Sequence, residues 1–163
     1  MALLVQKFGG TSVGSVERIQ AVAERIGRCR DDGDSVVAVV SAMGHTTDEL
    51  TGLAAAINAS PPQREMDMLL ASGEQVSIAL LAMALHQQGV TAVSMTGPQV
   101  GIVTESIHGR ARILEIRTDR IRNQLNEGRV VVVAGFQGTS SGPGGIAEIT
   151  TLGRGGSDTS AVA

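Results

Sequence analysis

Aromatic residues are nearly absent from this chain, which has only Phe8 and Phe136 and neither tryptophan nor tyrosine. An excess of one charge is also lacking: the net charge is −3, and the 13 lysines and arginines are scattered. No basic face is expected, which excludes nucleic acid as a partner. A single cysteine, Cys29, excludes an intrachain disulfide and favours a reducing cytoplasm. We expect Cys29 to be an inert helix residue rather than a reactive thiol.

Long apolar runs are missing as well. Polar residues or glycine interrupt the apolar stretches well short of the roughly 20 residues that a membrane span needs. The N-terminus lacks a basic segment followed by an apolar one and a cleavage site, so no signal peptide is expected. These absences favour a cytoplasmic protein without membrane contact, and 163 residues suffice for one ordinary domain.

Glycine, by contrast, is abundant, with 21 of 163 residues against an average usage of about 7%. The sequence is not of low complexity, so this excess suggests backbone that must approach a ligand closely. Both phenylalanines lie directly beside such glycines.

Strand patterns alternate with helical ones along the chain. Two valine-rich apolar runs, at 36–40 and 130–134, are typical of strands covered on both faces. Shorter strands are predicted at 3–6, 91–95 and 111–116. This alternation favours an α/β fold with a mostly parallel sheet and helices on both of its faces. Ligands in such folds bind beyond the carboxyl ends of the strands, where several of the glycines fall.

Helices are predicted where apolar residues recur at helical spacing. Ser72 and Gly73 are expected to separate a short helix at 65–70 from a buried one at 76–85. The glycine- and serine-rich segment 135–145 is predicted to be a surface loop with a hairpin. Further helices are predicted at 16–30, after Thr46, at 118–128 and from Ser157 onward.

Lys7 and the glycines after it form a first candidate site. The segment Lys7–Ser12 (KFGGTS) lies between a predicted strand and a predicted helix. Gly9 and Gly10 allow backbone N–H groups to face an anion, the helix N-terminus adds partial positive charge, and Lys7 adds a full one. The segment is a candidate for binding phosphate, although it lacks the spacing of a Walker loop. An ordinary strand–helix turn is the alternative.

Hydroxyl groups follow the second predicted strand. Ser41 lies at its end, and Thr46 and Thr47 open the next helix, an arrangement that suits a polar ligand. Thr46 also has the spacing of a capping box with Glu49, so helix capping is the alternative.

Two charged residues beside glycines complete the candidates. Glu74 is predicted at the start of the most apolar helix, where the helix dipole stabilises a carboxylate by about 0.3–1 kcal/mol; the functional alternative is a counter-ion for an ammonium group. Arg154 lies between glycines in LGRGGSD (152–158), and its planar guanidinium suits a carboxylate or phosphate. Ser157 or Asp158 can cap the helix that follows, and Asp158 can also orient a nearby ammonium group. The three histidines share no metal-ligand spacing, so no metal site is predicted.

In this order, the segments resemble the aspartate kinases of the amino acid kinase family. The resemblance covers essentially the whole chain, through KFGGTSVG (7–14), VSAMG (40–44), TTDEL (46–50), REMDMLLASGEQ (64–75), VAGFQG (133–138) and TTLGRGGSDTSAVA (150–163). It implies a three-layer α/β/α sandwich around a largely parallel sheet. It also implies that residues 1–163 are the N-terminal, acceptor-binding part of a kinase domain, truncated before the nucleotide half and the regulatory domains.

The resemblance assigns catalytic and phosphate-binding roles by matching position. Lys7 would neutralise charge on the transferring phosphoryl group, and Asp158 would hold Lys7 in place. The segment from Lys7 through Phe8, Gly9 and Gly10 would bind the nucleotide phosphates.

The resemblance also implies a set of substrate-binding residues. Glu74 would pair with the α-ammonium of aspartate, and Arg154 would bind its α-carboxylate. The full implied set is Ser41, Thr47, Glu74, Phe136, Arg154 and Ser157.

The implied reaction is ATP-dependent phosphorylation of the side-chain carboxylate of L-aspartate to 4-phospho-L-aspartate, the first step of lysine, threonine and methionine biosynthesis. Because this carboxylate is already ionised, catalysis is positioning and charge neutralisation, with Mg²⁺ bridging the ATP phosphates. The intact enzyme is expected to be a homo-oligomer, and this chain alone nearly inactive. The alternatives are a kinase for another carboxylate, a non-catalytic aspartate-binding module, or a subunit-interface fragment.

Overall fold

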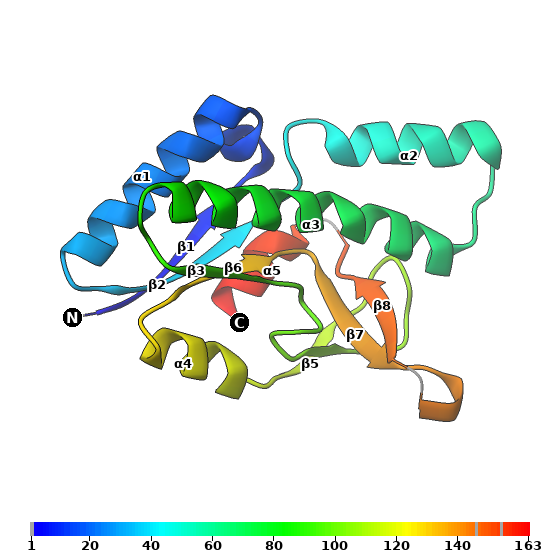
Figure 1. Ribbon diagram of the computed structural model, residues 1–163. Coiled ribbons are helices and arrows are strands. Elements are labelled where there is room, and N and C mark those ends of the chain that lie inside the picture. The colour runs from blue at the N-terminus through cyan, green and yellow to red at the C-terminus, as the bar shows by residue number, and fades with distance from the viewer. Residues whose placement is uncertain (1, 146, 154) are drawn as a thin grey trace.

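A four-stranded parallel sheet, called sheet A, forms the centre of the molecule (Figure 1). The computed structural model describes residues 2–145, 147–153 and 155–163. Every strand predicted from the sequence is present. In spatial order, sheet A consists of β1 (Leu3–Phe8), β2 (Ser35–Val40), β6 (Val130–Ala134) and β3 (Ala92–Met95).

Strand β2 explains why the central strands read as continuous apolar runs. Val36, Ala38 and Val40 belong to the core on one face of sheet A, and Val37 and Val39 belong to the core on the other. Successive side chains point to opposite faces, so a strand buried on both sides needs apolar residues at every position.

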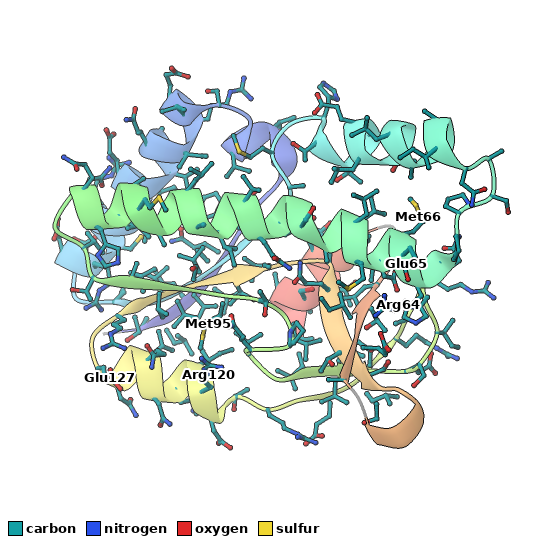
Figure 2. The ribbon with its side chains drawn as sticks, turned by 45° about the vertical axis from the view of Figure 1, so that its right-hand side comes forward. Arg64, Glu65, Met66, Met95, Arg120 and Glu127 are labelled. Carbon is teal, nitrogen blue, oxygen red and sulfur yellow. The ribbon has the colours of Figure 1, made fainter. Side chains whose placement is uncertain are left out.

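Helices cover both faces of sheet A and complete three layers, which confirms the predicted α/β/α fold (Figure 1). Helices α1 (Val16–Asp31) and α3 (Gln63–Gln87) pack on one face, and α4 (Asp119–Asn126) and α5 (Gly156–Val162) pack on the other. Met95, at the end of β3, is buried in the second core, on the side of α4 (Figure 2).

A second sheet, called sheet B, stands beside the carboxyl ends of sheet A. Its order is β5 (Ile113–Ile116), β4 (Ile102–Thr104), β7 (Gln137–Ser141) and β8 (Ala147–Thr151), antiparallel except between β4 and β7. The predicted hairpin is therefore present as β7 and β8, but the prediction of a surface loop at 135–145 is wrong for β7. Gln137 and Ser140 are buried there, because β7 lies between two other strands.

Helix α3 is one unbroken element that joins the two sheets. The predicted break at Ser72–Gly73 is wrong: Gly73 lies inside the helix, and a Cβ on it would be only 3.0 Å from the Cβ of Ala42. The glycine therefore allows close packing. Past Gly73, Leu81 and Leu85 cover sheet A; toward its start, α3 packs on β8, to which Arg64 is also tied through Glu148 (Figure 2).

By length and composition, α3 is the one described helix that could cross a membrane, with a mean hydropathy of 1.6 over 18 residues. Of that stretch, 44% is buried inside this domain. The prediction of a buried helix at 76–85 is wrong for one face, because Val76 and Met83 are 51% and 64% exposed.

Helix α2 (Thr46–Ile57) packs on α3 and has no buried residue. The predicted capping box is wrong. The helix already includes Thr46, and the Glu49 N–H donates to the His45 carbonyl at 3.0 Å. The N-cap is therefore His45, whose side chain makes no capping hydrogen bond.

Candidate functional site

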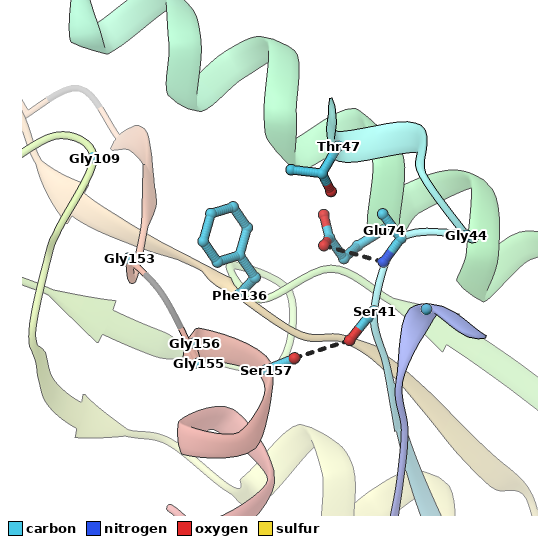
Figure 3. A pocket seen from close by; sticks show the side chains of 12 residues that line it. Ser41, Gly44, Thr47, Glu74, Gly109, Phe136, Gly153, Gly155, Gly156 and Ser157 are labelled. Atoms are coloured by element: carbon cyan, nitrogen blue, oxygen red, sulfur yellow. Dashed lines mark hydrogen bonds between the residues drawn. The ribbon is translucent and has the colours of Figure 1, made fainter. Parts of the chain in front are cut away.

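A cavity of about 470 Å³ opens where the carboxyl ends of β1, β2 and β6 meet sheet B (Figure 3). This is the edge at which the sequence predicted a ligand site. The cavity is lined by Gly10, Ser41, Ala42, Gly44, Thr47, Glu74, Gly109, Phe136, Gly153, Gly155, Gly156 and Ser157.

Six residues named from the sequence meet in this cavity: Gly10, Ser41, Thr47, Glu74, Phe136 and Ser157. They come from the segments after β1, β2 and β6 and from α2, α3 and α5. The Ser41 and Ser157 hydroxyls are 2.9 Å apart and hydrogen-bonded, which joins the end of β2 to α5 across the cavity floor (Figure 3). Segments up to 116 residues apart thus form one polar site.

Glu74 is the buried charge of the cavity. Its Oε1 accepts a hydrogen bond from the Ala42 backbone N–H at 3.2 Å, while its Oε2 is buried without a partner among the described residues. Burial raises the pKa of Glu74 to about 7, and the hydrogen bond from Ala42 only partly opposes this. The expectation that a helix start stabilises Glu74 is wrong, because α3 begins at Gln63. A cationic group in the cavity would satisfy the free oxygen and favour ionisation.

Phe136 has a left-handed backbone, with φ 69°, the only non-glycine residue of the described chain in that region. Such a conformation costs of order 1–3 kcal/mol for an ordinary residue and is found at ligand sites. Its N–H donates to the Ser160 hydroxyl at 3.2 Å, and its carbonyl accepts from the Leu152 N–H at 2.9 Å. These two bonds fix the turn that leads from sheet A into sheet B.

Lys7 and Asp158 form an ion pair, with 2.7 Å between Nζ and Oδ1. The pair joins the end of β1 to α5, directly beside Ser157. Its side chains are 31% and 66% exposed, so the pair is open to solvent and contributes little to stability. Gly9 lies over Lys7, since a Cβ there would be 3.5 Å from Nζ, whereas the Phe8 side chain is buried in the core.

Gly10 is required for the approach of β1 to the segment after β2. A Cβ on Gly10 would lie 2.8 Å from the Ala42 carbonyl oxygen, and the Gly10 carbonyl accepts from the Gly44 N–H at 2.9 Å. Glycine here brings two backbone segments together at the cavity rim.

Arg154 lies outside the described residues, although its neighbours Gly153 and Gly155 line the cavity. Neither Ser157 nor Asp158 caps α5, and of the two roles open to Asp158 the structure has the contact with an ammonium group, that of Lys7. The N-cap is Gly155, with φ 75°, so both residues fall inside the helix and their side chains are free for other contacts. Within the described part of the chain, no three histidine, cysteine, aspartate or glutamate side chains are grouped to hold a metal ion.

The model of the amino acid kinase family matches residues 2–163. The chain belongs to the amino acid kinase family.

Relatives within the amino acid kinase family have high sequence identity to this chain. The chain is 64% identical to the aspartokinase of Bacillus sp. (strain MGA3) and 61% identical to aspartokinase 2 of Bacillus subtilis (strain 168), in each case over all of its 163 residues. It spans 39% of the length of these relatives.

Solved structures share the fold. An aspartate kinase from Synechocystis matches with a TM-score of 0.81 at 61% identity, over 99% of this chain and 26% of that one. Escherichia coli aspartokinase III, solved with aspartate and ADP, matches with a TM-score of 0.77 at 23% identity, over 97% of this chain and 44% of that one.

Sequence reasoning missed two residues in or beside this cavity. Gly109 lines the cavity from the loop between β4 and β5, and nothing but a turn signal marks it in the sequence. Asp67 is fully buried and bonded to His108 and Gly109. Asp67 lies two helical turns before Glu74, on the same face of α3, but the predicted break at Ser72–Gly73 hid this relation.

Proposed function

We propose that this chain is the acceptor-binding part of an aspartate kinase, which transfers the γ-phosphoryl group of ATP to the side-chain carboxylate of L-aspartate. The aspartokinase names of relatives with 57–64% identity support this reaction. The intact enzyme would act in the cytoplasm as a homo-oligomer, at the first step of lysine, threonine and methionine biosynthesis.

The Oε2 atom of Glu74, which is buried and has no hydrogen-bond partner among the described residues, is the observation that carries the proposal. A buried carboxylate with a free oxygen is costly, and an ammonium group offsets that cost. Glu74 thus takes the α-ammonium of aspartate, and Arg154 takes its α-carboxylate. Ser41, Thr47, Ser157 and the backbone at Phe136 bind the remaining polar groups.

Lys7 and the glycines after it serve the phosphoryl group. A side-chain carboxylate oxygen of aspartate attacks the γ-phosphorus of MgATP, the bond from the γ-phosphorus to the β,γ-bridging oxygen breaks, and ADP leaves. No proton moves, since the acceptor is already ionised. The Lys7 ammonium, held by Asp158, neutralises the developing charge, while backbone N–H groups of Gly9 and Gly10 bind phosphate oxygens and Phe8 anchors the segment in the core.

Aspartate binding to the 163-residue chain tests the acceptor site, and calorimetry is the measurement. We expect saturable binding of L-aspartate that Glu74→Gln weakens at least about tenfold, because a neutral amide can accept a hydrogen bond from an ammonium group but cannot neutralise its charge. N-acetyl-aspartate should not bind, since it has no ammonium. Tight binding of the acetylated acceptor would instead indicate a kinase for another carboxylate.

Turnover needs the remaining length of a kinase, which a chimera with the rest of Bacillus subtilis aspartokinase 2 supplies. In that chimera, Lys7→Ala should lower turnover by about 100-fold or more with little change in aspartate affinity. Arg154→Ala should mainly weaken aspartate binding. The 163-residue chain alone should have little kinase activity. Aspartate binding without any turnover in the chimera would favour a non-catalytic binding module.

A further inference from the structure

Asp67 is a buried carboxylate for which the proposed reaction has no use. It lies in α3 with none of its surface exposed. Its Oδ1 accepts hydrogen bonds from the Thr151 hydroxyl at 2.6 Å and the Gly109 N–H at 3.0 Å. Its Oδ2 contacts His108 Nδ1 at 2.7 Å and the same Gly109 N–H at 3.1 Å. Both oxygens of this carboxylate therefore bond to two segments: the loop between β4 and β5, and the end of β8.

Both of these segments form a wall of the cavity. Gly109 lines it directly, and Thr151 ends β8 two residues before Gly153, which also lines it. The segments also hold each other: the Ala111 N–H donates to the Thr151 carbonyl at 2.9 Å, and a Cβ on Gly153 would lie 3.6 Å from the Gly109 carbonyl oxygen. Asp67 fastens this pair of segments to α3.

A buried ion is a poor way to stabilise a helix–sheet contact. Desolvation of a carboxylate costs several kcal/mol, and an apolar side chain of similar size is often as stable or more so. The carboxylate instead makes directional hydrogen bonds. These bonds fix the positions of two backbone segments that otherwise face each other at Gly109 and Gly153. Glu74 follows on the same helix, so α3 carries both the charge of the cavity and the anchor of its opposite wall.

We propose that Asp67 is a positioning residue for the acceptor cavity: by holding the 108–109 and 151–153 segments, it sets the shape into which the acceptor binds. The acceptor named here rests on the proposed function, whereas the anchoring itself does not. Loss of the anchor should weaken acceptor binding without touching any group that contacts the acceptor.

Three variants of the 163-residue chain test this, with L-aspartate titrated by calorimetry and unfolding followed by heating. Asp67→Ala should raise the Kd for aspartate at least about tenfold, since misplaced binding groups lose affinity steeply. Asp67→Asn keeps an oxygen for Thr151 and Gly109, and its amide can donate to His108, so its Kd should stay within about threefold of the parent. Leu85→Ala, in the core far along α3, should lower the Tm and leave the Kd unchanged.

Amide hydrogen exchange supplies a readout that needs no ligand. The Gly109 N–H should exchange much faster in Asp67→Ala than in Asp67→Asn or Leu85→Ala. If the parent chain binds no aspartate, the proposed function fails, and the exchange pattern alone decides on Asp67. Equal aspartate Kd values for the parent and Asp67→Ala, or unchanged exchange at Gly109, would overturn the positioning role. Should Asp67→Ala not fold, Thr151→Val removes one anchor bond at similar volume and is measured the same way.

Discussion

Burial raises the pKa of the Glu74 carboxylate from an ordinary value of 4.5 to about 7, and backbone hydrogen bonds only partly oppose this. A raised pKa means that the folded chain holds the Glu74 proton more tightly than the unfolded chain does. Folding therefore gains stability from Glu74 protonation at low pH and loses it as the pH rises from about 4.5 through 7.

We predict that Glu74→Gln is more stable than the parent chain at pH 8 by up to about 3 kcal/mol, since the amide carries no charge to bury. The difference should shrink as the pH falls through 7 and vanish below about 4.5, where Glu74 is protonated in both states. Urea unfolding at pH 4.5, 6 and 8 measures it. An advantage of equal size at all three values would contradict the assigned cause.

At the residue scale, sequence reasoning found much of the site through the resemblance but misjudged the surroundings of its residues. Ser41, Thr47, Glu74 and Ser157 do line one cavity. The raised pKa of Glu74 was not foreseen, because it depends on burial by segments distant in the sequence. Asp67 was missed for the same reason: its partners are 41 to 84 residues away.

At the scale of elements, the alternation of strands and helices was predictable because each central strand carries its own apolar signature. Helix α3 was not predicted as one piece. Ser and Gly in sequence read as a break by propensity alone, whereas Gly73 is held in the helix by its contact with Ala42. Tertiary packing overrides local preference there.

Three glycine-to-alanine substitutions separate the effect of helix propensity from that of tertiary packing. Gly52→Ala in α2 should stabilise the chain by about 0.5–1 kcal/mol, because a Cβ there meets no atom within 4 Å. Gly73→Ala should gain less, since its Cβ would lie 3.0 Å from Ala42. Gly97→Ala should destabilise by about 1–3 kcal/mol, because its Cβ would lie 1.9 Å from the Gln137 carbonyl oxygen. Urea unfolding ranks the three, and the opposite order would refute the packing argument.

At the scale of the whole molecule, the described part of the chain leaves the outer edge of β1 unpaired. Strand β1 bonds only to β2 in sheet A, and Leu3 and Val5 are 58% and 52% exposed. They border an apolar groove of about 240 Å³ that also includes Val39, Leu125 and Ala161. A free edge with apolar side chains favours pairing with other chains.

We predict that the 163-residue chain self-associates as its concentration rises, and that Val5→Lys reduces this by placing a charge on the free edge. Val16→Lys is the matched control, because Val16 is 62% exposed on α1 and outside the groove. Analytical ultracentrifugation measures both. Equal self-association of the two variants would exclude the β1 edge as its cause.

The continuity of α3 fixes a length. Asp67 and Glu74 are seven residues apart on one unbroken helix, a separation of about 10.5 Å along the axis at 1.5 Å per residue. This spacing is set by the backbone hydrogen bonds of α3 and does not vary with loop motion, so the distance between the anchor at Asp67 and the charge at Glu74 is constant. Selection among ligands of different length is then governed on this side by the fixed geometry of the helix, and any adjustment of size must come from the glycine segments opposite.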